Sequence, residues 1–243
     1  MEKTKLSIIT VVFNGEDHIE DAIKSVVTQK ENFEYIVVDG GSTDNTLEIL
    51  ERYSNEIDVI ISEPDHGIYD AMNKGLLLAK GDIIGFINSD DYYMDGIFSD
   101  VISLYEKMDC DVIHGDMNIV DFSSNKILER RVSNIRRLPF TMSLNHPSIF
   151  IKKEIYKKHK YSLDYKIASD YDLVLRLKKA KAKFCHLNIV IASMRNGGVS
   201  SVELESTKYE SNLVRKKNYG PVIYNLCNFY ISLRRVVNKT FGV

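Results

Sequence analysis

Gly81 to Tyr93 reads GDIIGFINSDDYY, an apolar run that ends abruptly in two adjacent carboxylates. Residues 83–87 have the length and composition of a buried strand, and Asp90 and Asp91 follow it closely. Two adjacent carboxylates at the end of a buried strand are costly unless a positive charge lies beside them. The stretch therefore predicts a core strand whose carboxyl end holds a cation, and a divalent metal is the obvious candidate.

Three similar units precede this strand. Apolar runs at 6–13, 33–38 and 59–61 end in turn residues, and a helical pattern follows each of them. Strands that alternate with helices at this spacing predict right-handed crossovers and a parallel sheet covered on both faces. Ligands of such sheets bind beyond the carboxyl ends of the strands. The polar residues at those ends are Asn14, Asp39, Glu63, Asp65, Asp90 and Asp91.

The second half of the chain has a different pattern. A helix is expected over 97–108, and a hairpin turn at 123–125 leads into a strand over 127–132. Further strand segments are expected at 112–113, 118–120, 148–151 and 184–194, with a helix that begins near 168–170. We therefore expect an α/β fold whose second half is antiparallel or mixed.

Composition excludes several classes of protein. The 243 residues carry a net charge of −2, which argues against a general nucleic-acid binder. The three cysteines are isolated in the sequence, which predicts neither a disulfide framework nor a thiolate metal site and favours a reducing cytosol. The first residues lack the features of a signal peptide, and no apolar run reaches the roughly 18 to 20 residues of a membrane span.

The C-terminal segment is basic and amphipathic. Residues 211–243 contain no acidic residue, and apolar residues recur there at helical spacing. A helix packed on the domain is the favoured interpretation. The alternative is a peripheral contact with an anionic membrane, to which each basic residue contributes about 1 kcal/mol. The apolar stripe consists of Val222, Leu226, Phe229, Leu233 and Val236.

Four blocks of the first hundred residues resemble, in order and spacing, those of family 2 glycosyltransferases with the GT-A fold. They read LSIITVVFNGEDHIEDAIKSV (6–26), YIVVDGGSTDNT (35–46), SEPDHGIYDAMNKG (62–75) and GDIIGFINSDDYY (81–93). NHPSIF and IASDYDLVLRL resemble the later blocks more loosely. The resemblance implies a GT-A catalytic domain over 1–202, with a nucleotide-binding half at 1–95, an acceptor half at 96–202 and a helical tail at 203–243.

The resemblance also implies a UDP-sugar donor and a Mn²⁺ or Mg²⁺ ion. Asp91 corresponds to the metal ligand, and Asp90 helps at the metal or the ribose. Asn88 stands where a strict Asp-x-Asp motif has its first aspartate. Asp39 corresponds to the acceptor of the uracil imide hydrogen. The residues expected to border the base or nucleotide are Val11, Phe13, Asn14 and Asn73.

The acceptor side needs a base. Asp170 corresponds to the family aspartate that takes the proton of the acceptor hydroxyl, although Ser169 replaces the usual glutamate before it. Asp172 is the alternative base, and a first-turn helix residue is the plain structural interpretation of both. Asp65 and His146 are further acceptor-side candidates, and a structural role for His146 is equally compatible. Residues 197–200 form either a diphosphate loop or a plain turn.

The implied activity is an inverting, metal-dependent transfer of sugar to a hydroxyl of a glycan or lipid-linked acceptor. The implied setting is bacterial surface polysaccharide or lipopolysaccharide assembly, in the cytoplasm or at the inner face of the plasma membrane. A nucleotidyltransferase and a non-catalytic sugar-nucleotide-binding protein are the alternatives. The first is disfavoured because Asn14-Gly15-Glu16 is not a basic, glycine-rich phosphate loop. The sequence leaves the sugar, the acceptor and a homo-oligomeric state open.

Overall fold

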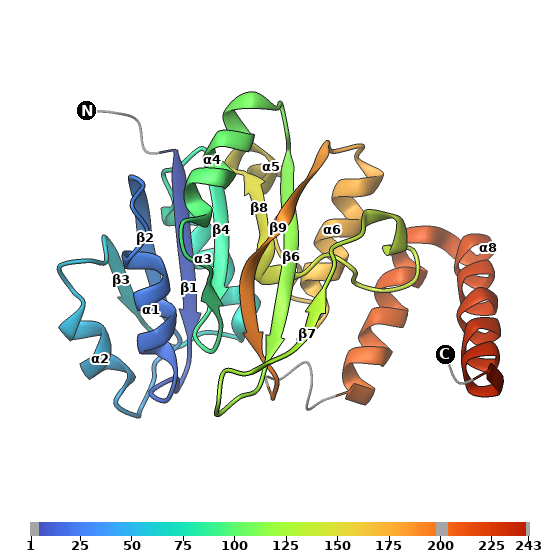
Figure 1. The fold of residues 1–243 in the computed structure, drawn as a ribbon, viewed down its shortest axis with the longest axis horizontal. Helices are drawn as coiled ribbons and strands as arrows, with labels where there is room; N and C mark the ends of the chain where they lie inside the picture. The colour runs from blue at the N-terminus through green and yellow to red at the C-terminus, as the bar shows by residue number, and fades with distance from the viewer. Residues whose placement is uncertain (1–4, 198–203, 242–243) are drawn as a thin grey trace.

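The computed structural model describes residues 5–197 and 204–241, with side chains through residue 233. Nine strands in these residues form one sheet in the order β3-β2-β1-β4-β8-β6-β9-β5, with β7 paired to β6 (Figure 1). β1 to β4 are parallel, whereas β8 is antiparallel to both of its neighbours. The predicted α/β fold with a mixed sheet is confirmed.

The N-terminal half alternates strands and helices as predicted. Its strands are β1 (Leu6–Val12), β2 (Phe33–Asp39), β3 (Val59–Ser62) and β4 (Ile83–Asn88), and its helices are α1 (Ile19–Val27), α2 (Thr46–Arg52) and α3 (Ile68–Leu78). The apolar residues of α1 recur at helical spacing, so that Ile19, Ala22, Ile23 and Val26 are all buried.

The second half completes the sheet. Its strands are β5 (Tyr92–Tyr93), β6 (Val112–Val120), β7 (Ile127–Arg131), β8 (Ile149–Lys152) and β9 (Phe184–Arg195), and its helices are α4 (Ile97–Lys107), α5 (Lys153–Lys158), α6 (Ser169–Lys179) and α8 (Leu204–Phe241). The two segments predicted at 112–113 and 118–120 are one buried strand. The sequence suggests two segments because the middle of the strand contains the polar residues His114 and Asp116. Both are buried, and each forms a hydrogen bond with Ser133.

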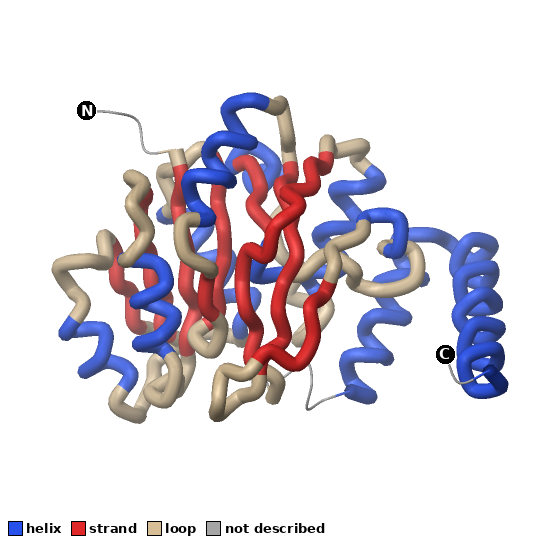
Figure 2. Tube along the Cα trace, in the orientation of Figure 1, coloured by secondary structure: helices blue, strands red, loops and turns tan. Residues whose placement is uncertain are grey.

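Helices cover both faces of the sheet (Figure 2). One apolar core lies between the sheet and α1, α2 and α4, and the other lies between the sheet and α3 and α6. Gly75 of α3 allows close packing, because a Cβ there would lie 2.6 Å from a methyl group of Ile9. Because helices cover both faces, the carboxyl ends of the parallel strands form the edge of the sheet that the helices leave open.

The last helix, α8, breaks at Gly220, where φ is 70° and ψ is 172°, and Pro221 follows. The first half packs against α6, and the second half turns back beside the first (Figure 1). Val222 and Phe229 are 70% and 69% exposed, so the interpretation of the apolar stripe as a packed helix face is wrong. No helix in the described part of the chain is long and apolar enough to cross a membrane.

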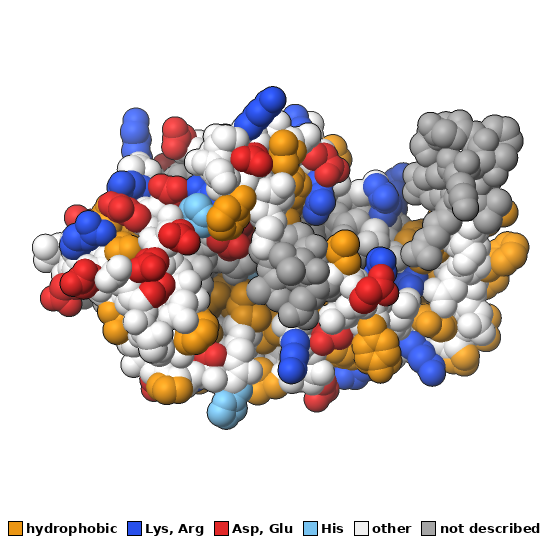
Figure 3. Space-filling model, turned by 90° about the horizontal axis from the view of Figure 1, so that it is seen from below, with side chains coloured by type: hydrophobic (Ala, Val, Ile, Leu, Met, Phe, Trp, Pro, Cys, Tyr) orange, Lys and Arg blue, Asp and Glu red, His pale blue; other side chains and the backbone are white. Residues whose placement is uncertain are grey.

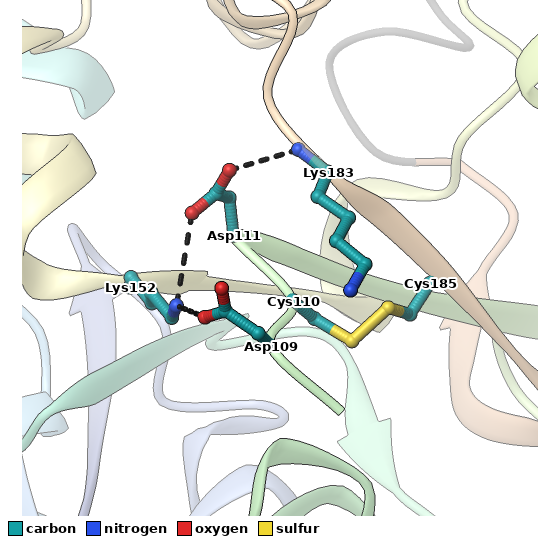
Figure 4. The surroundings of a disulfide bond; sticks show 6 residues. All are labelled: Asp109, Cys110, Asp111, Lys152, Lys183 and Cys185. Atoms are coloured by element: carbon teal, nitrogen blue, oxygen red, sulfur yellow. Dashed lines mark hydrogen bonds and ion pairs between the residues drawn. A yellow bond between two sulfur atoms is a disulfide. The ribbon is translucent and has the colours of Figure 1, made fainter. Parts of the chain in front are cut away.

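The prediction that the cysteines are isolated is also wrong. Cys110 and Cys185 form a disulfide with Cα atoms 5.9 Å apart, and Cys227 is free and buried. Cys110 precedes β6 and Cys185 lies in β9, so the bond joins the amino ends of two adjacent parallel strands (Figure 4). The sequence did not indicate this disulfide, because its two cysteines are 75 positions apart. The parallel pairing of β6 and β9 brings them together. With this disulfide, the cysteines no longer favour a reducing compartment.

We expect the disulfide to stabilise the fold without affecting the open edge. Reduction should lower the free energy of unfolding by about 2 to 4 kcal/mol, because a long loop is released in the unfolded chain. Denaturant unfolding with and without dithiothreitol measures the difference, and a Cys110→Ser/Cys185→Ser double variant is the control that should not respond. Equal stability of wild type with and without reductant would contradict the prediction.

Candidate active site

The carboxyl ends of β1, β2 and β4 meet at one edge, as predicted. Figure 3 views the molecule from below Figure 1, onto this edge, and acidic side chains are prominent over its left part, where the N-terminal half lies. Paired residues align the strand ends, since Val12 is opposite Asp39 and Val11 is opposite Asn88. The candidate residues of the N-terminal half are therefore neighbours in space.

Asp90 and Asp91 lie in the turn after β4. Asp91 is 1% exposed, and burial together with the charge of Asp90 raises its pKa well above the usual value. Burial also raises the pKa of Asp90. The amide oxygen of Asn88 is buried without a hydrogen-bond partner in the described structure. Two carboxylates and an unpartnered amide oxygen, all hard oxygen donors, therefore lie within four residues of one another at the end of β4.

These oxygen donors could hold a divalent cation if the substrate of the protein also coordinated that cation. No cluster of three His, Cys, Asp or Glu side chains capable of holding a metal occurs among the described residues. Mg²⁺ usually takes only one or two protein carboxylates and completes its shell with water and substrate phosphates. The carboxylates of the described residues therefore form no preformed metal cage, and they could hold Mn²⁺ or Mg²⁺ only together with water and a ligand.

Arg195 is the principal residue that the sequence did not reveal. Its side chain is almost completely buried at the end of β9, where Nη1 donates to the carbonyl of Asp90 at 2.8 Å. Nη2 forms an ion pair with Asp21 of α1 at 2.6 Å, and the guanidinium lies 5.2 Å from the ring centre of Tyr92. Its backbone N–H reaches Asp91 Oδ1 at 3.3 Å. Arg195 thus fixes the aspartate turn to β9 and α1.

His18 is a second residue outside the predictions. Its ring packs edge-on against Phe122, with centroids 4.5 Å apart, and its Nε2 is buried without a partner in the described structure. A protonated His18 would favour the ionised form of Asp90. The sequence shows only that a histidine lies in the loop between β1 and α1. It does not indicate that this histidine contacts Phe122.

Asp39 has a different environment from the one predicted. It is fully buried, and its carboxylate accepts hydrogen bonds from the N–H groups of Gly41 and Ser42. The hydroxyls of Ser42 and Ser62 also donate to it, the latter at 2.6 Å. A carboxylate has about four acceptor positions, and these four donors occupy them. In this structure Asp39 therefore shapes the β2–α2 loop instead of offering a free acceptor to a base.

An aromatic ring and a second carboxylate lie beside that loop. Phe13 is 63% exposed, which suits stacking on a planar base. Asp65 Oδ1 accepts from Gly67 N at 2.7 Å, and its Oδ2 has no hydrogen-bond partner in the described residues. A Cβ on Gly40 would lie 2.5 Å from Asp65 Oδ2 and 3.5 Å from Phe13 Cβ. The missing side chain of Gly40 therefore lets Asp65, which the sequence predicts on the acceptor side, lie close to the end of β2 and to Phe13.

The three other predicted nucleotide contacts lie in different environments. Val11 is buried in β1. Asn73 forms two hydrogen bonds with the backbone of Tyr161, one to its oxygen at 3.0 Å and one from its nitrogen at 3.1 Å. Asn14 is exposed with φ of 50°, and its side chain accepts from Thr43 N at 2.8 Å. Asn14 remains at the edge, whereas Asn73 faces the second half.

Asp170 lies in the first turn of α6. Burial raises its pKa to about 6, although the N–H of Tyr171 donates to it at 2.7 Å and opposes this rise. Tyr69 of α3 lies at 3.4 Å from the same oxygen. The preceding loop is held by Glu210 of α8, whose carboxylate accepts from the N–H groups of residues 166–168. A carboxyl with a pKa near 6 is suited to general-base chemistry near neutral pH.

Asp172 and His146 are bound to protein groups. Asp172 is 1% exposed, pairs with Arg176 at 2.6 Å and accepts from Asn218 of α8 at 3.0 Å. Burial lowers the pKa of His146 to about 4, and its Nε2 contacts the hydroxyl of Tyr161 at 3.0 Å. Asp172 is therefore a structural link to α8, whereas no ion pair to Asp170 is found among the described residues. The loop predicted at 197–200 lies largely outside the described residues.

The chain is similar in sequence to several known proteins. The sequence model of the family described as "Glycosyl transferase family 2" matches residues 7–169. A PGL/p-HBAD biosynthesis glycosyltransferase of Mycobacterium bovis is 29% identical over 210 residues, with 83% of this chain and 81% of the relative covered. The minor teichoic acid biosynthesis protein GgaB of Bacillus subtilis is 27% identical over 73% of this chain and 21% of its own length.

Solved structures share the fold. A fragment of Staphylococcus aureus TarS, residues 1–349 with UDP, superposes with a TM-score of 0.71 at 23% identity, over 88% of this chain and 65% of that fragment. The complex of the same fragment with UDP-GlcNAc gives a TM-score of 0.69 at 22% identity, over 87% and 65% of the two chains. This chain thus spans about two thirds of the length of that fragment. The family match over residues 7–169, more than half of the chain, shows that the chain belongs to glycosyltransferase family 2.

Proposed function

We propose that this glycosyltransferase moves a sugar from a UDP-sugar, with inversion, to a hydroxyl of a glycan or lipid-linked acceptor in bacterial surface polysaccharide assembly. The observation that carries the proposal is Asp170, a carboxyl with a pKa of about 6 in the second half. The similar proteins support the substrate class, since they include a PGL/p-HBAD biosynthesis glycosyltransferase, a minor teichoic acid biosynthesis protein and TarS in complex with UDP. The family match favours transfer of sugar over the nucleotidyltransferase alternative.

On the donor side, we assign the uridine to the surface beside Gly40. The Phe13 ring would stack on the base, and Asp65 Oδ2 would accept the imide hydrogen that the sequence assigned to Asp39. Asp91, Asp90 and the Asn88 oxygen would hold the Mn²⁺ or Mg²⁺ ion. A bound cation would neutralise charge on the diphosphate leaving group. Arg195 keeps the turn of both aspartates in place.

On the acceptor side, Asp170 takes the proton from the attacking hydroxyl as the bond to the anomeric carbon forms. Burial keeps its pKa high enough for it to accept that proton, and Glu210 holds the loop that leads to it. Residues 211–243 provide a peripheral contact with an anionic membrane where a lipid-linked acceptor would lie. A homo-oligomer remains an alternative for the exposed apolar stripe.

Replacement of the base should remove turnover and leave the donor bound. Asp170→Asn should lower kcat/KM by about 10² to 10⁴-fold, measured as UDP release from a panel of UDP-sugars, with unchanged affinity for UDP. In wild type, kcat/KM should rise with pH and reach half its plateau at about pH 6, because Asp170 must be ionised. Asp164→Asn, an exposed change nearby, is the control. Full activity of Asp170→Asn would refute the assignment.

The metal proposal predicts loss of activity in excess chelator and recovery on addition of Mn²⁺ or Mg²⁺. Asp91→Asn should cost at least about 10²-fold in kcat, since the leaving group loses its counter-charge. With UDP present, Mn²⁺ should raise the thermal unfolding midpoint of wild type and not of Asp91→Asn. Chelator-resistant turnover would contradict the proposal.

The uridine assignment predicts a change of base preference. Asp65→Asn keeps an acceptor for Gly67 but turns an amide donor toward the imide, so UDP should bind about tenfold more weakly. The preference for UDP over CDP, measured by competition, should fall with it, because cytosine N3 accepts a hydrogen bond. Glu63→Gln, at an exposed carboxylate two residues away, should leave both quantities unchanged. Unaltered UDP affinity in Asp65→Asn would refute the contact.

A further inference from the structure

Arg215 is a buried cation in a part of the chain that has no role in the proposed chemistry. It lies in the first half of α8 and is 6% exposed. Its Nη2 donates to Asn212 Oδ1, and its guanidinium lies 5.8 Å from the ring centre of Tyr224. Its Nη1 is buried without any hydrogen-bond partner in the described structure. One face of this guanidinium therefore lacks a protein acceptor.

No carboxylate in the described residues forms an ion pair with Arg215, and the sequence contains no acidic residue after Glu210. A buried guanidinium without a counter-charge costs several kcal/mol. Proteins usually retain such a group where an anion binds. The positive charge of Arg215 therefore has no counter-charge among the described residues, and an anion that enters beside Arg215 would supply one.

Arg215 lines a groove of about 960 Å³ between the two halves of α8 and the loop at 137–141. Three cationic side chains, Arg137, Lys208 and Arg215, line it against a single acidic one. That acidic residue, Glu205, is exposed and already paired with Lys208 at 2.7 Å. The groove therefore carries a surplus of positive charge.

Apolar groups border the same groove. Phe140 and Tyr230 line it and contact each other with ring centroids 4.8 Å apart. The outer side of the second half exposes Leu226 and Phe229, and Figure 3 shows hydrophobic side chains along the right edge of the molecule, where α8 lies. An apolar chain could leave the groove along this side. The ligand that matches is an anion with an apolar tail.

We propose that the groove at Arg215 binds the phosphate of a membrane lipid, with Arg137 and Lys208 around it and the lipid chain against Phe140 and Tyr230. Arg215 supplies planar donors that match phosphate oxygens. The proposal rests on the peripheral membrane contact and makes it specific, because one buried arginine carries more of the binding than the surface charges do. It is independent of glycosyl transfer.

Co-sedimentation of the full chain with phosphatidylcholine vesicles, with and without phosphatidylglycerol, tests the site. Arg215→Gln should weaken binding to the phosphatidylglycerol vesicles about tenfold or more, because hydrogen bonds to a charged group are lost. Lys216→Gln removes the same charge from an exposed neighbour and should cost at most about fivefold. Equal losses of vesicle binding in Arg215→Gln and Lys216→Gln would mean that the surface charges bind the membrane without a specific site. That result would overturn the proposed site at Arg215. Failure of all proteins to bind would overturn the membrane contact, whereas UDP-sugar turnover would be unaffected.

A second variant separates binding from folding. Arg215→Met removes the unpaired charge, so its thermal unfolding midpoint should equal or exceed that of wild type while vesicle binding is lost. A lower midpoint would make Arg215 a structural residue and overturn the proposal. Inorganic phosphate that stabilises wild type but not Arg215→Gln, without vesicle binding, would assign the groove to a free phosphate compound. A wild-type dimer that Arg215→Gln dissociates would assign it to a second copy of the chain.

Discussion

The burial of Asp90 and Asp91 at the end of β4 is the constraint on which the catalytic edge depends. Burial desolvates both carboxylates. One buried cation, Arg195, reaches the turn from β9 and also forms an ion pair with Asp21 of α1. The turn after β4, the end of β9 and helix α1 meet at this point. Any cation that binds the aspartates therefore enters a turn that the tertiary structure has already fixed.

The second half of the site depends on a different helix. Asp170 needs burial to have its raised pKa, and this burial is created by α3, α6 and the loop that Glu210 of α8 holds through three backbone N–H groups. Asp172, two residues away, takes part in the same contact with α8 through Asn218. The first half of the C-terminal helix thus supports the loop before Asp170 and holds Arg215 buried, while the second half exposes an apolar face.

Local patterns predicted much of this architecture. The crossovers of the first half, the mixed second half and the rim of strand-end polar residues follow from hydrophobic periodicity and turn chemistry, which are properties of neighbouring residues. Partners distant in the chain were not accessible by that means. The pairs Cys110–Cys185 and Arg195–Asp21 and the contact of Asn73 with Tyr161 each join segments that periodicity does not connect.

The sequence by itself determined the family, the strand that ends in Asp90 and Asp91, and the choice of Asp170 as the candidate base. Only the tertiary structure decided how these groups are solvated. Asp39 is saturated by four donors while Asp65 has an oxygen free of described partners, and the apolar stripe of α8 faces outward instead of inward. The physical reason is that residue type sets what a side chain can bind, whereas burial and competing partners set what it does bind.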